Sequence, residues 1–143
     1  QRIRGGMFEA IVSCRFPWVE LGWGLENYPK YFNTITGLDW ELEDFWPSAD
    51  RIYGIMKLFW LREFPDTDRR ADYPPAVWFD PANADTEGPI AGRHLEYDRY
   101  DALLQHYYDI RGYDERGIPT RETLERLGLA AEAAAAEQFA TLT

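Results

Sequence analysis

Apolar residues recur at helical spacing between residues 48 and 63, and this pattern limits the fold more than any other part of the chain. In steps of one, three and four, they are Ile52, Ile55, Met56, Phe59 and Trp60. Such steps place side chains on one face of an α-helix, whereas a half-buried strand needs strict alternation. Ser48, directly after Pro47, is a suitable N-cap for this helix. The pattern predicts an amphipathic helix over residues 48–63.

Two further segments carry clear helical signals. Residues 97–111 combine helical spacing with a glycine stop at Gly112. Thr120 is a good N-cap for a third helix, which is expected to stop at Gly128. No segment alternates as a half-buried strand does, so every clearly predicted element is helical.

The N-terminal third is less regular. Residues 7–16 fit either a strand or a short buried helix, because periodicity cannot decide at this length. A loop is then expected to lead into a short helix over residues 28–34 that stops near Gly37. Asp39 is expected to cap another short helix, which runs to Trp46 before a proline interrupts it.

The rest of the chain completes the domain. Residues 64–95 are rich in proline and without a period, which predicts an ordered but irregular excursion. The tail, residues 129–143, has strong helix propensity but little to bury beyond Phe139 and Leu142, so it is expected to fray. No repeat or linker divides the sequence. Residues 1–143 therefore predict one mainly α domain, a bundle-like packing of four or five helices with long, irregular, aromatic-rich loops.

Charge and cysteine usage narrow the functional classes. The formal net charge of −10 disfavours nucleic acid and anionic membranes as partners, because both attract basic surfaces. A single cysteine fits a reducing compartment, so a cytoplasmic location is expected. The sequence contains no run of about 18 apolar residues, the length that a membrane-spanning helix needs. Residues 1–6 resemble no signal peptide and lack an initiator methionine, so the coding sequence is expected to continue upstream.

Cys14 and the two histidines are the candidates for metal or nucleophilic chemistry. Taken by itself, Cys14 is either a small core residue or a ligand whose companions lie elsewhere. The neighbouring Arg15 would favour its thiolate form. His94 and His106 are twelve residues apart, whereas a two-histidine site on one helix needs a separation of about four. The sequence contains no calcium loop and no glycine-rich phosphate loop.

Four segments follow a recognisable pattern in a fixed order. They are ITGLDW at 35–40, RIYGIMKLFWLREF at 51–64, EGPIAGRHLEYDRYDALLQHYYD at 87–109, and YYDIRGYDERGIPTRETLERLGL at 107–129. Together they resemble the C-terminal part of the tungsten-containing aldehyde:ferredoxin oxidoreductase family. The resemblance spans nearly the whole chain up to Leu129, although Trp60 stands where the family usually has asparagine.

The resemblance also assigns roles to two residues near the N-terminus. The family's cofactor motif, Asp-x-x-Gly-Leu-Cys, aligns with Glu9-Ala10-Ile11-Val12-Ser13-Cys14. It implies that Cys14 is the last of four ligands of a 4Fe-4S cluster. Glu9 takes the place of the aspartate that hydrogen-bonds a pterin, and keeps its carboxylate. Val12 and Ser13 replace the family's glycine and leucine.

The family implies a function for the intact protein. Its members hold tungsten in a bis-pyranopterin beside the cluster, oxidise aldehydes to carboxylic acids and pass electrons to ferredoxin. The other cluster ligands lie in upstream domains of the same enzyme, so both cofactors are expected only in the intact enzyme and this fragment alone is expected to be inactive. Two alternatives stay open: a subunit of a tungsten-dependent benzoyl-coenzyme A reductase, and a stand-alone helical interaction domain without redox activity.

Aromatic residues make up 16% of the chain. Phe16, Trp18, Trp23 and Tyr28 follow Cys14, and either border a substrate channel in the whole enzyme or belong to an ordinary core. Channel residues should be partly exposed and face the same side as Cys14. The isolated chain is also expected to expose an aromatic surface, and therefore to self-associate or pack against a neighbour.

Overall fold

The structure, a computed structural model, describes residues 1–143 and contains helices but no β-strand. Its α-helices are α1 (Phe8–Ala10), α2 (Phe16–Leu21), α3 (Asn27–Thr36), α4 (Phe45–Glu63), α5 (Tyr97–Arg111), α6 (Arg121–Arg126) and α7 (Ala130–Ala136). A π-helical segment, η1 (Arg2–Met7), runs into α1, and the short 3-10 helices are η2 (Leu42–Asp44), η3 (Arg69–Asp72), η4 (Ala76–Trp78) and η5 (Pro81–Asn83). The prediction of a mainly α fold is confirmed.

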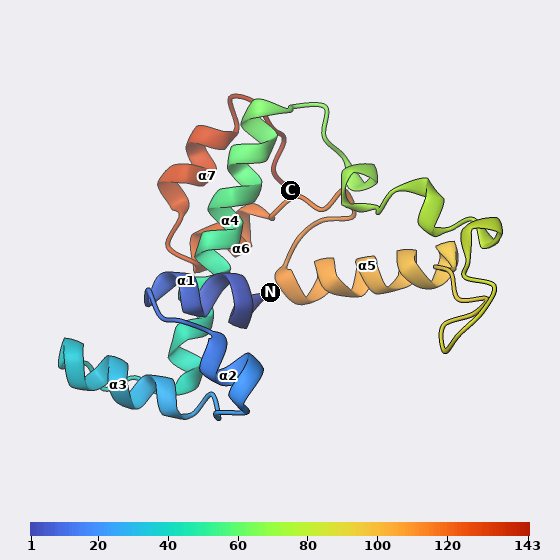
Figure 1. Ribbon diagram of the computed structural model, residues 1–143. Coiled ribbons are helices and arrows are strands. Elements are labelled where there is room, and N and C mark those ends of the chain that lie inside the picture. Colours follow the sequence, from blue (N-terminus) through green and yellow to red (C-terminus); the bar gives the residue numbers. More distant parts are fainter.

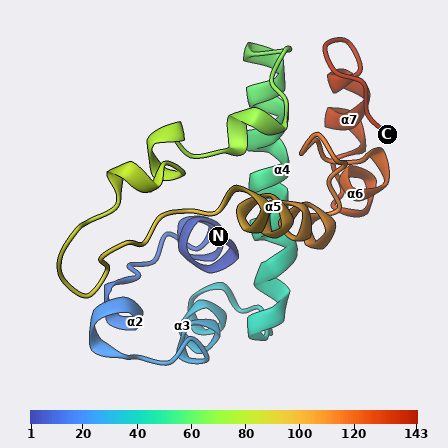
Figure 2. The same cartoon turned by 90° about the vertical axis from the view of Figure 1, so that its right-hand side faces the viewer.

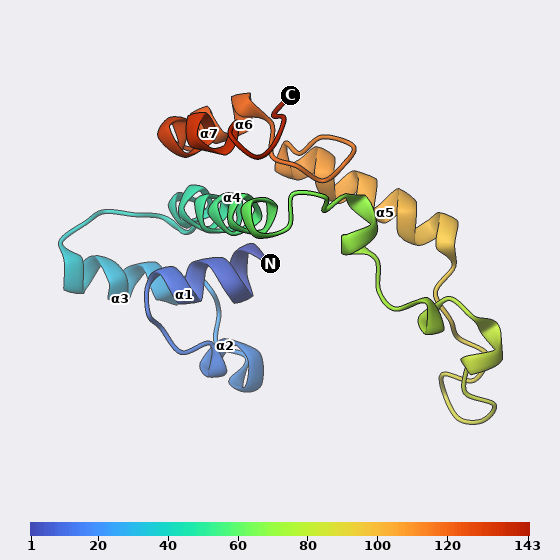
Figure 3. The same ribbon diagram turned by 90° about the horizontal axis from the view of Figure 1, so that it is seen from above.

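Helix α4 is the axis around which the other elements are arranged (Figure 1). Seen along this helix, α6 and α7 lie on one side, while η1, α1 and α3 lie on the other (Figure 3). Helix α5 and the irregular residues 64–96 extend away from this body and form an arm (Figures 1 and 3). A view nearly along α5 shows the irregular segment looping out beside it (Figure 2).

Two hydrophobic clusters hold the body together. The larger joins α4 to α6 and α7, and its buried members are Leu58, Leu61, Ile118, Leu124, Leu127, Leu129, Ala133 and Ala136. The smaller joins η1 and α1 to α3 and to the start of α4, and its buried members are Met7, Phe8, Tyr28 and Phe45. Gly6 brings η1 close to α4, because a Cβ atom at this position would lie 2.3 Å from the Cβ atom of Ala49.

The spacing pattern at residues 48–63 identifies a helix correctly, but its apolar stripe does not face the core. The residues that α4 buries are Phe45, Ala49, Gly54, Leu58 and Leu61. By contrast, the predicted apolar face is half exposed, with Ile55 at 46%, Met56 at 49%, Trp60 at 53% and Phe59 at 54%. The buried side points to α6 and α7, since Gly54 lies against the side chains of Leu124 and Leu129.

Helix α4 begins earlier than predicted, and the expected caps are wrong. Glu41, not Asp39, caps η2 in a capping box, and its backbone N–H donates to the Asp44 carboxylate at 2.8 Å. Because η2 runs directly into α4, Pro47 and Ser48 lie in the first turn of this helix. Proline is tolerated there because the amides of a first turn have no partner within the helix.

Several other boundaries lie where the sequence predicts them. Gly37 and Gly112 end α3 and α5 in the left-handed conformation, with φ of 74° and 67°. Thr120 caps α6, and its hydroxyl accepts a hydrogen bond from the backbone N–H of Thr123 at 3.2 Å.

The N-terminal third contains more helix than expected. Residues 7–16, which fit a strand or a helix, are helical as far as Ala10. Helix α2 replaces part of the expected loop. Its sequence signals are Pro17 in the first turn and Gly22, which ends the helix with φ of 67°.

The C-terminal tail buries more than its composition suggests. Ala133 and Ala136 are fully buried in the larger cluster, and Phe139, Ala140 and Leu142 pack against it. The small side chains of Ala133 and Ala136 allow α7 to pack against α4. The expectation that little besides Phe139 and Leu142 is buried is therefore wrong, while fraying stays a prediction. No helix of the chain has both the length and the apolarity needed to cross a lipid bilayer.

Candidate functional site

The turn that follows α1 has a sharply defined backbone. Val12 has φ of 51° and is the one non-glycine residue with a positive φ. The backbone N–H of Ser13 donates to the carbonyl of Phe8 at 3.0 Å, and that of Val12 donates to the carbonyl of Glu9 at 3.3 Å. These two bonds form a Schellman motif, whose left-handed residue is usually glycine. A β-branched side chain is strained in this conformation, so Val12 departs from the family's glycine where glycine fits best.

Cys14 follows this turn with an exposed side chain. Its backbone carbonyl accepts a hydrogen bond from the Tyr28 hydroxyl at 3.2 Å. Tyr28 itself is 4% exposed and packs edge-on against Phe8, with ring centroids 4.9 Å apart. The core thus anchors the backbone of Cys14 and leaves the thiol accessible. The alternative that Cys14 is a buried core residue is wrong.

Glu9 lies on α1, before the strained turn, and is exposed like Cys14. The chain contains no group of three or more histidine, cysteine, aspartate or glutamate side chains that could together hold a metal ion. His94 and His106 are both exposed, on the arm. The exposed thiol fits the role of a single ligand in a metal cluster, and every other ligand would have to come from outside these residues.

An apolar groove lies beside the turn that carries Cys14. It has a volume of about 430 Å³, and no charged side chain lines it. One wall is the turn itself, and the other is a face of α3 formed by Tyr28, Tyr31, Phe32 and Ile35. These α3 residues recur in steps of one, three and four, so helical spacing is the sequence signal from which this wall could have been predicted.

The four aromatic residues expected to border a channel divide into two pairs. Trp23 and Tyr28 both line the groove, and their ring centroids are 5.5 Å apart. Phe16 is 55% exposed, and Trp18 packs against Phe8 with ring centroids 5.7 Å apart. The structure therefore brings Trp23 and Tyr28 to the groove beside the thiol-bearing turn, while Phe16 and Trp18 lie outside its lining.

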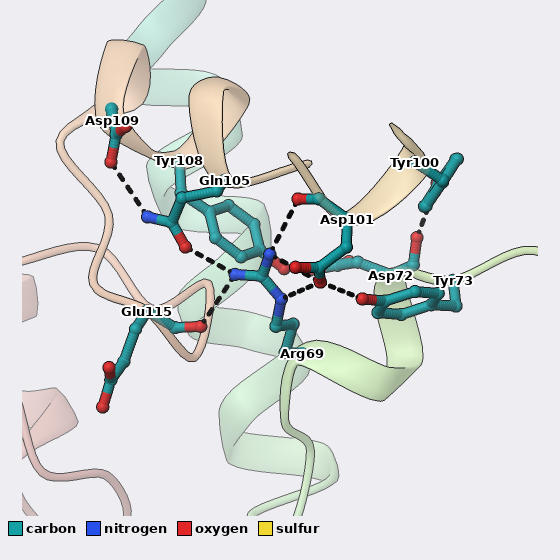
Figure 4. Close-up of polar contacts among 9 residues, drawn as sticks. All are labelled: Arg69, Asp72, Tyr73, Tyr100, Asp101, Gln105, Tyr108, Asp109 and Glu115. Carbon is teal, nitrogen blue, oxygen red and sulfur yellow. Dashed lines mark hydrogen bonds and ion pairs between the residues drawn. The ribbon is translucent and has the colours of Figure 1, made fainter. Parts of the chain in front are cut away.

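A group of polar side chains within the arm joins the irregular residues 64–96 to α5 (Figure 4). The Arg69 guanidinium donates to the carboxylate and the backbone carbonyl of Asp101 at 2.8 to 3.0 Å. It also donates to the Gln105 side chain at 2.7 Å and to the Glu115 carbonyl at 3.2 Å. The Tyr73 hydroxyl donates to the same Asp101 carboxylate. Because each guanidinium nitrogen has a partner within the chain, this cluster connects three segments and offers no free cation to a ligand.

The ionisation of this cluster supports the same interpretation. Hydrogen bonds from Tyr73 and Arg69 lower the pKa of Asp101. Loss of hydration, followed by the hydrogen bond to Asp101, raises the pKa of Tyr73 to about 12. Burial, followed by a hydrogen bond to Asp72 at 2.6 Å, raises the pKa of Tyr108. These shifts move each pKa away from neutrality, whereas a general acid or base works best with a pKa near the operating pH.

A second polar cluster fixes η1 against α4 and α5. Asp50 accepts two hydrogen bonds from Arg2 at 2.8 and 2.9 Å and pairs with Arg111. Arg111 is 7% exposed, donates to the Gln1 side chain at 2.8 Å, and stacks over Tyr53 at 5.0 Å. Charges this strongly paired serve the packing of the three elements. We therefore take Cys14 and the groove beside it, and not these two charged clusters, as the candidate site.

Comparison with known proteins gives one consistent family. The family model described as aldehyde ferredoxin oxidoreductase, domains 2 & 3, matches residues 1–129. The tungsten-containing aldehyde ferredoxin oxidoreductase of Pyrococcus furiosus is 32% identical over 124 residues, which are 87% of this chain and 19% of that protein. The enzyme of the same name from Thermococcus kodakarensis is 30% identical over 124 residues, with the same coverage. The chain spans about a fifth of the length of the curated relatives it matches.

Two other similar proteins carry different names. The aliphatic sulfonate oxidoreductase, WOR-like subunit, of Pyrococcus furiosus is 28% identical over 126 residues, which are 85% of this chain and 19% of that protein. Among solved structures, the active-site complex BamBC of benzoyl-coenzyme A reductase, determined with 1,5-dienoyl-CoA, is similar with a TM-score of 0.61 and 25% identity. That similarity covers 81% of this chain and 16% of the other. Since a single family model accounts for residues 1–129 and the relatives agree with it, this chain belongs to the aldehyde ferredoxin oxidoreductase family.

Proposed function

We propose that this chain is part of a cytoplasmic tungsten-dependent enzyme that oxidises aldehydes to carboxylic acids and passes the electrons to ferredoxin. The observation that carries the proposal is the exposed Cys14 thiol, held at the family motif on a backbone that Tyr28 anchors. In such an enzyme a tungsten bis-pyranopterin supplies two-electron oxidation, and a 4Fe-4S cluster transfers single electrons.

In this proposal Cys14 supplies one thiolate to the cluster. Ligation needs a deprotonated and accessible sulfur, and the exposed side chain meets the second requirement. The Tyr28 hydroxyl holds the Cys14 carbonyl, which limits how far the turn can move once the thiolate is bound. The family resemblance assigns Glu9 to the pterin, and its exposed carboxylate is available to accept a hydrogen bond there.

The groove beside Cys14 is proposed to form one wall of the substrate channel. Its lining is apolar apart from hydroxyl groups and carries no charge, so it suits an uncharged, apolar part of a substrate. Trp23 and Tyr28 would bind that part and exclude water from the route to the cofactor. Phe16 and Trp18 are outside this lining and are not included in the proposed wall.

Metal analysis of the full-length enzyme tests this function. We expect tungsten and iron in the purified protein, and we expect Cys14→Ala to lose most of its iron and the electron paramagnetic resonance signal of the reduced cluster. Ser13→Ala, a neighbouring change without a ligand role, should keep both. Glu9→Gln should lower the tungsten content and leave the cluster signal intact. A Cys14→Ala enzyme with unchanged iron and an unchanged cluster signal would refute the ligand assignment.

The similarity to the benzoyl-coenzyme A reductase complex supports a second candidate function, reduction of the aromatic ring of a CoA thioester. The two candidates differ in the direction of electron flow. An assay with aldehydes and an oxidised acceptor should give turnover for the first, and an assay with an aromatic CoA thioester and a low-potential reductant should give turnover for the second. A natural protein no longer than this chain and free of iron and tungsten would instead support a stand-alone interaction domain.

A further inference from the structure

The exposed side of α4 and the residue that directly follows the helix carry large apolar side chains. We call this surface the α4 stripe and define it as Ile55, Met56, Phe59, Trp60 and Phe64. Each of these side chains is about half exposed, from 46% for Ile55 to 54% for Phe59 and Phe64. A stripe at this spacing on a helix ordinarily faces a core. Here the core contacts of α4 lie on other sides of the helix, toward α6 and α7 and toward η1.

The residues in and around the α4 stripe have the composition of a protein–protein interface. Trp60 and Phe64 stack with their ring centroids 5.0 Å apart and their planes at 29°. At the edge, the Arg62 guanidinium lies 4.8 Å from the ring centre of Phe59 and pairs with Glu63 at 2.8 Å. An apolar, aromatic centre with a charged rim is the usual composition of a protein contact surface.

The length of the relatives indicates what covers the stripe. This chain corresponds to 19% of each tungsten-containing relative, so about four fifths of such an enzyme lies outside it. A second copy of the chain is a poorer candidate, because each copy carries a formal net charge of −10 and the two would repel each other. Resting on the proposed function, that the chain is a segment of a larger oxidoreductase, we propose that the α4 stripe packs against an apolar surface of the remaining part of the same polypeptide.

Oxidation of methionine in the full-length enzyme tests whether the stripe is covered. The chain has two methionines, Met56 in the stripe, 49% exposed, and Met7 in the core, 0% exposed. Peroxide treatment followed by peptide mass spectrometry should oxidise Met56 in the native enzyme at least ~10-fold more slowly than in the unfolded enzyme, because a covered residue reacts only through local opening. Met7 provides the fully buried reference. Native Met56 that oxidises as fast as in the unfolded enzyme would overturn the proposal.

Cross-linking identifies what covers the stripe. Phe59 is replaced by the photoreactive p-benzoylphenylalanine in the full-length enzyme, which is then irradiated. The expected product is a cross-link within one polypeptide, to a peptide outside the sequence described here. A product of twice the enzyme's mass would mean that a second copy covers the stripe, and would overturn the proposal. Tungsten and iron are measured in the same preparation. Failure of the stripe proposal in an enzyme that contains both metals thus differs from failure of the proposed function, in which the metals are missing.

Discussion

Two regions of the molecule differ in how completely they bury their own apolar residues. Around α6 and α7, a closed region buries leucine and alanine side chains, and Leu61, Leu124 and Ala133 are at most 1% exposed. The open region consists of two separate surfaces, the α4 stripe and the groove beside Cys14, where Phe59, Ile35 and Val12 are between 54% and 93% exposed. Both regions are apolar in sequence. The closed region thus folds against itself, whereas the open region leaves apolar surface uncovered within this chain.

The largest effect should separate the two sides of α4. Leu61→Ala opens a cavity in the closed region and should lower the free energy of unfolding of this chain by about 3 kcal/mol. Phe59→Ala removes a larger side chain from the open region but should change it by less than about 1 kcal/mol, because much of the ring already contacts water. Urea denaturation of the two variants gives both values. Equal losses would show that the stripe is packed within this chain, contrary to the comparison.

In the intact enzyme, Phe59→Ala and Leu61→Ala should cause more similar losses of stability than they do in this chain alone. There the α4 stripe is expected to be buried, so the cost of Phe59→Ala should approach that of Leu61→Ala, about 3 kcal/mol. When unfolding cannot be reversed, the rate of irreversible thermal inactivation is compared instead; it reports the barrier to unfolding, and both variants should inactivate faster than the parent. A Phe59→Ala enzyme that inactivates at the parent rate would argue against burial of the stripe.

A smaller loss of stability is expected from a change at the contact between η1 and α4. Gly6→Leu forces a side chain against Ala49, whose Cβ atom would be 2.3 Å from the new Cβ atom. Overpacking of this kind should cost about 2 kcal/mol, as measured by thermal denaturation. Ala131→Leu places the same leucine side chain at an exposed position of α7 and is the control. Equal stability of the two variants would mean that η1 does not pack closely on α4.

How much the sequence predicts follows the same division. The cap at Thr120 in the closed region and the stop at Gly112 after α5 are local signals, and both are found where predicted. Along α4, periodicity identifies the helix but not its buried side, because apolar residues face both the core and an expected partner. Cys14 could be singled out by resemblance, but its exposure and its link to Tyr28 depend on how α1 and α3 pack. Contacts between distant segments leave no local signal.

Changes in pH should weaken the contact between the irregular residues 64–96 and α5, a modest effect that the apolar regions do not share. The pKa of Asp101 is lowered in the folded chain, so its contribution to stability is present above the ordinary pKa of about 4 and is lost as the pH falls through the lower, folded value. The pKa of Tyr73 is raised to about 12. Its contribution is therefore complete below about pH 10, the ordinary tyrosine pKa, and is lost as the pH rises toward the folded value.

Replacing Tyr73 by phenylalanine separates these two limits. Tyr73→Phe should remove the part of the alkaline loss of stability that this phenol causes. It should also lower stability at neutral pH and make the loss on acidification smaller, because Asp101 loses a hydrogen bond that lowers its pKa. Melting temperatures of parent and variant at about pH 3, 7 and 11, chosen to bracket the ordinary pKa values, test this. Tyr31→Phe, at an exposed tyrosine on α3, is the control and should leave the profile unchanged. An unchanged profile for Tyr73→Phe would exclude a stabilising role for this contact.

The smallest effect should be a gain, and it lies in the open region at Val12. A left-handed backbone costs a residue with a side chain ~1–2 kcal/mol relative to the usual conformation. Glycine avoids that strain, but it loses more conformational freedom on folding, and this entropy loss offsets ~0.5–1 kcal/mol of the stabilisation. Val12 is 93% exposed, so its removal sacrifices little packing. The midpoints of these two ranges differ by ~0.75 kcal/mol, so Val12→Gly should stabilise the chain by about that much in urea denaturation.

Val12→Ala is the matched control, because alanine keeps the Cβ atom that causes the strain and should gain less than glycine does. In the full-length enzyme, Val12→Gly should leave the iron content unchanged, since the family motif has glycine at this position and the Schellman bonds do not involve the side chain. A loss of iron together with a gain in stability would mean that the exposed valine itself contacts part of the enzyme next to Cys14. That result would assign the open region a role in cofactor binding beyond the cysteine ligand.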